Sequence, residues 1–111
     1  MLADMSVQLA AARLMVRNAA ANSNPFPDPL GAAQAKILAA ETAIAVTNTA
    51  LQIHGSSGYS RNLPLERMVR DARMFTIAGG TAQILRTLVA SQLLGRKLPQ
   101  TRDGYAKGLG E

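Results

Sequence analysis

Two glycine-containing junctions hold the residues whose types and order favour binding chemistry. The first spans residues 52–59 and reads Gln52, Ile53, His54, Gly55, Ser56, Ser57, Gly58 and Tyr59. Its glycines allow backbone N–H groups to approach a phosphate, and Gln52 offers both donors and an acceptor. A helix stop followed by a flexible turn explains the same residues. His54, the single imidazole, fits a hydrogen-bonded structural role better than that of an acid or base.

The second junction reads Gly79, Gly80, Thr81, Ala82 and Gln83. A helix that begins after two glycines and a threonine presents unpaired N–H groups and the positive end of its dipole, which suits an anion. An ordinary threonine N-cap explains the segment equally well. Both junctions are therefore candidate binding segments with structural alternatives.

Groups able to run a reaction alone are scarce in this chain. The seven carboxylates are scattered, and no paired-carboxylate arrangement, Ser/His/Asp set or phosphate loop with a lysine is visible. Zero cysteines and one histidine exclude a disulfide framework and make a metal cluster very improbable, so no metal site is expected. We expect the chain to contribute to a cofactor site rather than to catalyse by itself.

The net charge of +5 raises the question of nucleic-acid binding. The cations group in two places, Arg61, Arg67, Arg70 and Arg73 in one and Arg96, Lys97, Arg102 and Lys107 in the other. They lack the interleaved aromatic residues that stack on bases. A solvated face or an anionic small ligand is therefore favoured, and a favourable i,i+4 pair is expected between Glu66 and Arg70.

Apolar residues at steps of three and four predict an all-α fold. Helices are expected over residues 2–21, 30–53, 65–77 and from the Thr81 cap to 94, with Gly55 and Gly95 as helix stops. The result is an antiparallel bundle of three long helices and one short helix. Residues 1–95 form this domain, and residues 96–111 form a basic, extended or disordered tail.

The composition constrains how these helices pack. Apolar residues make up 48% but aromatic residues only 4%, so alanine, leucine, isoleucine, valine and methionine must fill one core. Alanine-rich stretches permit close backbone approach on more than one face, and a further helical partner is expected. No apolar run reaches the roughly 20 residues needed to span a bilayer, so no membrane contact and a cytoplasmic location are expected.

The order of these motifs closely resembles the C-terminal region of acyl-CoA dehydrogenases, from Leu2 to about Leu94. The collinear pieces are Leu2-Ala3-Asp4-Met5, Ala12-Arg13-Leu14, Ala35-Lys36 with Glu41, Gln52-Ile53-His54-Gly55 with Gly58-Tyr59, Pro64-Leu65-Glu66-Arg67, Arg70-Asp71-Ala72-Arg73, and Gly80-Thr81-Ala82-Gln83-Ile84 with Arg86. Each piece alone is weak, but the ordered set is specific.

The resemblance implies an FAD-dependent oxidation of an acyl-CoA thioester to the enoyl-CoA, in a homo-oligomer such as a dimer or tetramer. It implies that Gln52, Ile53, His54, Gly55 and Ser56 contact the adenosine diphosphate part of FAD from the neighbouring subunit. Thr81, Ala82 and Gln83 resemble the second FAD-contacting stretch, and Gly80 matches a position near the substrate. FAD is expected only when the missing domains or a partner subunit are present.

Two residues depart from the family pattern. Ser56 stands where many members have a second glycine, and Gly79 occupies the position where many carry the catalytic glutamate. Other members place that glutamate on the first bundle helix, which would precede Leu2, so no catalytic residue is assigned here. The chain is therefore expected to be a partial domain of such an enzyme. A noncatalytic helical oligomerisation module and a flavin monooxygenase of the same fold are the alternatives.

Overall fold

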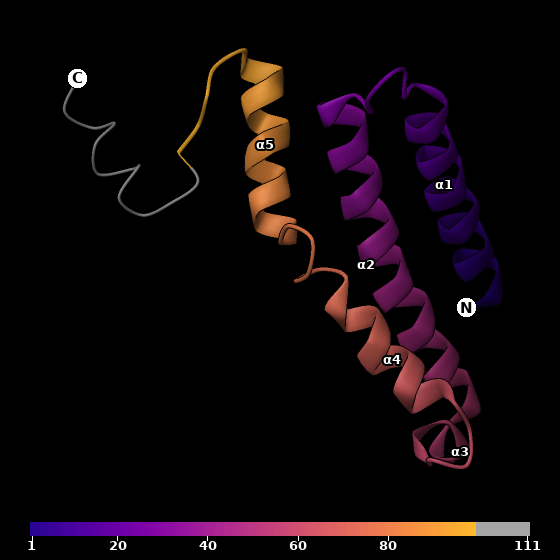
Figure 1. Ribbon diagram of the computed structural model, residues 1–111. Coiled ribbons are helices and arrows are strands. Elements are labelled where there is room, and N and C mark those ends of the chain that lie inside the picture. The colour runs from indigo at the N-terminus through magenta and orange to yellow at the C-terminus, as the bar shows by residue number, and fades with distance from the viewer. Residues whose placement is uncertain (100–111) are drawn as a thin grey trace.

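The computed structural model describes residues 1–99, and every regular element among them is a helix (Figure 1). The helices are α1 (Leu2–Ala21), α2 (Pro29–His54), α3 (Ser56–Tyr59), α4 (Leu65–Met74) and α5 (Ala82–Leu94). The all-α prediction of three long helices and one short helix is confirmed, with α3 as an addition. Most of the predicted tail, residues 100–111, lies outside the described residues, and the boundary at residue 95 stays a prediction.

Helix α2 is the centre of the arrangement. Helix α1 runs antiparallel to it on one side, and α4 and α5 follow one another along the other side in the direction opposite to α2 (Figure 1). Within residues 1–99, α1 contacts α2 and no other helix, and α4 and α5 both pack on α2. The described helices thus pack on two sides of α2 and do not close into a bundle.

Helix α2 begins and ends where its sequence signals predict. An Oδ2 atom of Asp28 accepts a hydrogen bond from the N–H of Gly31 at 2.8 Å, and Pro29 stands at the first helical position. At the other end, Gly55 has a φ of 58° and a ψ of −137°. The positive φ was expected for a helix-closing glycine, but the ψ lies outside the left-handed helical region.

The segment after Gly55 folds as the short helix α3, where the sequence predicted only a flexible turn. The N–H of Gly58 donates to the carbonyl of Gly55 at 3.0 Å, and that of Ser60 donates to Ser56 at 3.2 Å. Gly58 is buried, and a Cβ atom added there would lie 2.5 Å from the carbonyl oxygen of Leu51. The missing side chain therefore lets α3 fold back against α2.

Helix α4 is shorter than predicted, ending at Met74 rather than at residue 77. The N–H groups of Ile77 and Ala78 both donate to the Met74 carbonyl, at 2.9 and 2.8 Å, and turn the chain away from the helix axis. Helix α5 begins as predicted, because the Thr81 hydroxyl accepts from the N–H of Ile84 at 3.1 Å. Gly95 ends α5 with a φ of 65°, in the left-handed region.

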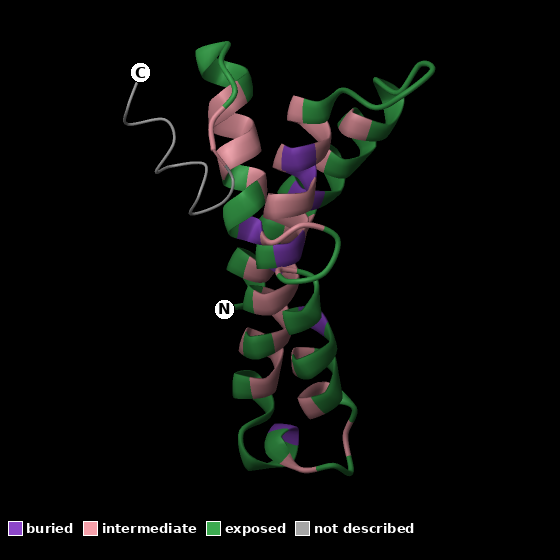
Figure 2. Ribbon diagram, turned by 60° about the vertical axis from the view of Figure 1, so that its left-hand side comes forward, coloured by how far each residue is buried: buried purple, intermediate pink, exposed green. Residues whose placement is uncertain are grey.

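The core is small and built of alanine. The buried apolar residues are Ala12, Ala33, Ala35, Ala40, Ala72 and Ala82. No side chain among residues 1–99 is completely buried, and burial concentrates where α2 meets its neighbours (Figure 2). The large apolar side chains of Ile84 and Leu93 on α5 are 40% and 69% exposed and take no part in this core.

Among residues 1–99, none of the helices combines the length and the apolar character needed to cross a membrane.

Candidate cofactor-contact site

The junction between α4 and α5 depends on two glycines in unusual backbone conformations. Gly79 and Gly80 have φ angles of 69° and 96°, a region that residues with a side chain rarely adopt. A Cβ atom on Gly80 would also lie 3.2 Å from the side chain of Leu85. The backbone therefore takes a path between the two helices that favours glycine at both positions.

Two charged side chains of α2, Lys36 and Glu41, contact the chain before and after this junction. The ammonium group of Lys36 donates to the carbonyls of Phe75 and, at 2.9 Å, Ala78. An Nη atom of Arg86, in the second turn of α5, lies 2.6 Å from Oε1 of Glu41. Neither contact is local in sequence, so α2 sets where α4 ends and how α5 is oriented.

The first turn of α5 leaves one backbone donor free. The N–H of Ala82 donates to the Thr76 carbonyl at 3.0 Å, and the hydroxyl of Thr81 occupies the N–H of Ile84. The N–H of Gln83 has no partner within residues 1–99, and Gln83 is exposed. A free N–H at the positive end of a helix dipole can receive an anionic or acceptor group.

The other predicted segment, residues 52–56, lies exposed at the C-terminal end of α2. The N–H of Gly55 is used by the Gln52 carbonyl at 3.1 Å, whereas those of Ser56 and Ser57 have no partner within residues 1–99. Nδ1 of His54 lies 2.9 Å from the Ala50 carbonyl of its own helix. This contact agrees with a hydrogen-bonded structural histidine, and Ser56 and Ser57 supply the available donors.

The structure does not bring the two predicted segments together within one chain. Glu41, which contacts α5, and Gln52 are eleven residues apart on α2. At 1.5 Å per residue they are separated by roughly 17 Å along the helix axis. A ligand that touches both segments of one chain would therefore have to be extended.

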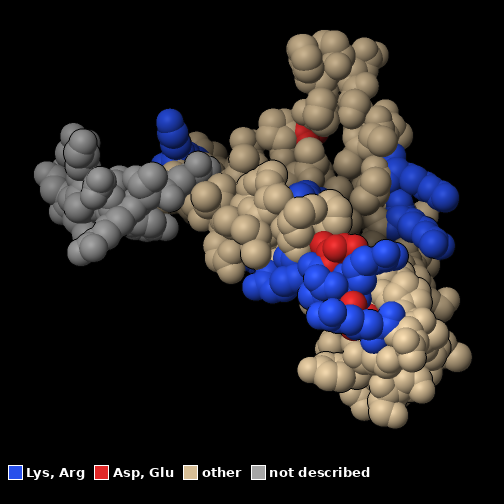
Figure 3. All heavy atoms as spheres, turned by 60° about the horizontal axis from the view of Figure 1, so that its bottom comes forward, with Lys and Arg blue, Asp and Glu red and all other residues tan. Residues whose placement is uncertain are grey.

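A cluster of charged groups borders the first segment. A cavity of about 440 Å³ lies between α2, α3 and α4. It is lined by Leu51, Tyr59, Arg61, Glu66, Val69 and Arg70. The Arg70 guanidinium donates to both Glu66 oxygens, at 3.0 and 3.2 Å, which confirms the predicted i,i+4 pair. This hydrogen bonding lowers the pKa of Glu66. Cationic side chains gather around acidic ones on this face (Figure 3), so its positive charge is partly neutralised.

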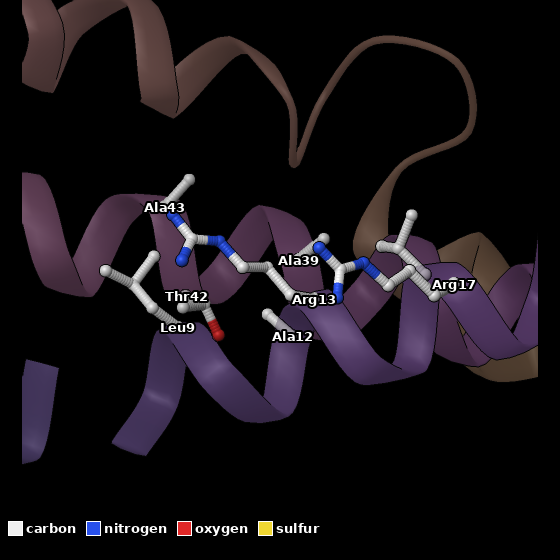
Figure 4. A pocket seen from close by; sticks show the side chains of 8 residues that line it. Leu9, Ala12, Arg13, Arg17, Ala39, Thr42 and Ala43 are labelled. Atoms are coloured by element: carbon white, nitrogen blue, oxygen red, sulfur yellow. The ribbon is translucent and has the colours of Figure 1, made fainter. Parts of the chain in front are cut away.

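A second hollow, which the sequence did not predict, is a groove between α1 and α2. It has a volume of about 300 Å³ and is lined by Leu9, Ala12, Arg13, Val16, Arg17, Ala39, Thr42 and Ala43. Figure 4 shows the Arg13 and Arg17 side chains extending between the two helices, beside the small side chains that line the groove. Only the alanines at facing positions could have pointed to it, because small residues on both helices leave space.

Metal-binding chemistry has no support in the described part of the chain. Residues 1–99 contain no group of three histidine, cysteine, aspartate or glutamate side chains placed to hold an ion.

The sequence of this chain matches a known protein family and several known enzymes. Residues 1–94 match the sequence profile of the family described as "Acyl-CoA dehydrogenase, C-terminal domain". The chain is 73% identical over 107 residues to a 3-sulfinopropanoyl-CoA desulfinase of Advenella mimigardefordensis, and 72% identical over 107 residues to one of Variovorax paradoxus. Each match covers 96% of this chain and 27% of the relative.

Solved structures agree with the sequence matches. The chain superposes on butyryl-CoA dehydrogenase of Megasphaera elsdenii with a TM-score of 0.80 and 39% identity, over 84% of this chain and 24% of that one. The chain therefore spans about a quarter of the length of the relatives it matches.

Proposed function

This chain belongs to the acyl-CoA dehydrogenase family as its C-terminal helical domain, and from that premise we propose that it is part of a 3-sulfinopropanoyl-CoA desulfinase. The identity of 72–73% to two desulfinases supports this specificity more strongly than the 39% identity to a butyryl-CoA dehydrogenase. The whole enzyme needs further domains, because the chain covers only 27% of those desulfinases. Its contribution is a set of cofactor contacts and an interface between subunits.

The proposed reaction breaks the bond between C3 of the acyl chain and sulfur. Water supplies a proton to C3 and an oxygen to sulfur, so 3-sulfinopropanoyl-CoA and water give propanoyl-CoA and hydrogen sulfite. Carbon is reduced while sulfur is oxidised, and the reaction needs no external oxidant. An acyl-CoA dehydrogenation, by contrast, must pass two electrons and two hydrogens to an acceptor.

The residues of the two junctions fit FAD, the cofactor of this family. We assign Gln52, Ile53, His54, Gly55 and Ser56 to the adenosine diphosphate part of FAD bound mainly by a neighbouring subunit. The free N–H groups of Ser56 and Ser57 support this assignment, and so does the separation from the second junction. Thr81, Ala82 and Gln83 form the second contact, where the free Gln83 N–H offers a donor. FAD supplies redox chemistry when bound.

Gly80 is assigned to the substrate side of the junction, and Gly79 marks the absence of a general base there. A desulfinase does not need a net loss of hydride from its substrate, so a glycine at this position is compatible with the proposed reaction. A second candidate, oxidation to the enoyl-CoA, has its support in the likeness to butyryl-CoA dehydrogenase. That reaction would require a carboxylate base on another part of the enzyme.

A chimeric enzyme tests this proposal. The segment of the Advenella mimigardefordensis desulfinase that matches this chain is replaced by this chain, and the purified chimera is assayed for flavin absorbance and for sulfite release from 3-sulfinopropanoyl-CoA. The matched control receives the corresponding segment of the Megasphaera elsdenii butyryl-CoA dehydrogenase. We expect this chain, but not the control segment, to support sulfite release close to the rate of the parent enzyme.

The other outcomes separate the alternatives. Dye reduction by butyryl-CoA without sulfite release would favour the dehydrogenase. Oxygen uptake without a product from either thioester would favour the flavin monooxygenase. A folded chimera that binds no flavin would leave only the noncatalytic module. Light scattering of the active chimera measures whether it is the expected dimer or tetramer.

A further inference from the structure

Lys36 of α2 makes hydrogen bonds to a distant part of the chain. It is half-buried on α2, and its ammonium reaches the carbonyls of Phe75 and Ala78, which are 39 and 42 residues further along the chain. Phe75 is the residue that follows α4, and Ala78 directly precedes Gly79. A single cation of α2 therefore joins the end of α4 to the start of the glycine junction.

The carbonyls that Lys36 binds are suited to a cation. The last carbonyl groups of a helix have no donor within the helix, and they carry the negative end of its dipole. Lys36 donates to the carbonyl of Phe75, the residue directly after α4, and, at 2.9 Å, to the carbonyl of Ala78. The direction of the following peptide groups then depends on this contact, because the chain has only Gly79 and Gly80 before the cap at Thr81.

The two glycines have no side chains of their own to fix the path of the backbone. No atom lies within 4 Å of a Cβ atom placed on Gly79. Both glycines have a positive φ, and neither has a side chain that would restrict rotation of the backbone. On the far side, the bond from the Ala82 N–H to Thr76 and the pair of Glu41 with Arg86 fix α5. On the near side, the Met74 carbonyl holds the N–H of Ala78 at 2.8 Å, and the Lys36 ammonium holds its carbonyl at 2.9 Å.

We propose that Lys36 is a positioning residue for the reaction: it fixes the Ala78 carbonyl and thereby sets the place of Gly80 and of the Gln83 N–H. This inference rests on the proposed function, in which those groups border substrate and FAD. Lys36 itself touches neither. Its removal should therefore misplace the junction without abolishing the fold or the affinity for the thioester.

The test uses the chimera with Lys36→Met, which keeps the aliphatic stem and removes the donors, and with Lys36→Arg, which keeps a cation. Arg17→Met, which removes one cation from α1 away from both junctions, is the matched control. We expect Lys36→Met to lower kcat roughly 10- to 100-fold with little change in KM, since small misplacements cost rates of this size. Lys36→Arg should recover most of the loss, and the flavin absorption band should shift only in Lys36→Met.

Amide hydrogen exchange provides a readout independent of activity. Peptides that cover residues 75–85 should exchange faster in Lys36→Met than in the unaltered chimera or in Arg17→Met, while peptides from α1 stay unchanged. An unaltered kcat and exchange pattern in flavin-loaded Lys36→Met would overturn the proposal. So would a loss of activity that only follows a loss of folded or flavin-loaded protein. If the unaltered chimera binds flavin but releases no sulfite, the proposed function fails, and the exchange and flavin spectra still decide the role of Lys36.

Discussion

At the scale of single residues, Gly79 constrains the backbone between α4 and α5. Its φ of 69° lies in the left-handed region, where a residue with a Cβ atom costs roughly 1–2 kcal/mol. A glutamate placed there would meet this strain in addition to its charge. A side chain at this position is therefore disfavoured by the backbone conformation, even though the space around it is open.

Substitution of Gly79 should follow backbone preference rather than side-chain size. We expect Gly79→Ala to lower the thermal midpoint of the chimera, and Gly79→Asn to lower it less, because asparagine tolerates the left-handed region although it is larger. Differential scanning calorimetry measures both. Equal losses in the two variants, or a greater loss for asparagine, would show that packing rather than φ constrains this position.

Glu66 provides a prediction about pH. The hydrogen bonds from Arg70 lower its pKa from the ordinary value of 4.5. A carboxyl whose pKa is lower in the folded state contributes stability above its unfolded pKa, and loses it as the pH falls through the folded pKa. We expect the Glu66 resonance to titrate below 4.5 in an NMR titration, and to move toward this value in Arg70→Met. An unchanged midpoint in the variant would contradict the assigned cause.

At the scale of elements, the cap of α2 can be isolated from the candidate site. Asp28 accepts the Gly31 N–H at the far end of α2 from residues 52–56. Asp28→Ala should free that N–H at a cost of about 1 kcal/mol and speed its hydrogen exchange roughly fivefold, whereas Asp28→Asn keeps an acceptor. Faster exchange in both variants would point to charge rather than to the hydrogen bond.

The helices with local signals could be predicted from sequence. Asp28 with Pro29, the Thr81 cap and Gly95 are short-range features, and α2 and α5 begin and end within one or two residues of the expected positions. The end of α4 could not be predicted, because the carbonyls at Phe75 and Ala78 are satisfied by Lys36 from another helix. Likewise α3 depends on contact between Gly58 and Leu51, which no local pattern encodes.

The candidate site could be predicted only in part for a similar reason. The glycine motifs identified both junctions, and the i,i+4 spacing identified the Glu66–Arg70 pair. The contacts that position the second junction, Lys36 to Ala78 and Glu41 to Arg86, join residues more than 40 apart. The assignment of FAD contacts and the place of the substrate stay predictions, since they depend on parts of an enzyme beyond this chain.

At the scale of the whole molecule, the described helices leave much apolar surface uncovered. Large side chains that are more than half exposed occur on both outer helices, among them Val7 and Leu14 of α1 and Leu93 and Leu94 of α5. The buried apolar residues are all alanines, which gain little from burial. Exposed apolar side chains on both outer helices indicate surfaces that can pack against other protein.

The isolated chain should therefore associate with itself. Val7 and Leu14 are 69% and 66% exposed, and α1 contacts only α2 within residues 1–99. We expect light scattering to show association that grows with concentration, and Val7→Lys with Leu14→Lys to reduce it. Ser6→Lys with Gln8→Lys adds the same charge at exposed polar positions and should have little effect, because the apolar contacts remain. A monomer at every concentration, or equal effects of the two double variants, would show that this face of α1 is not an interface.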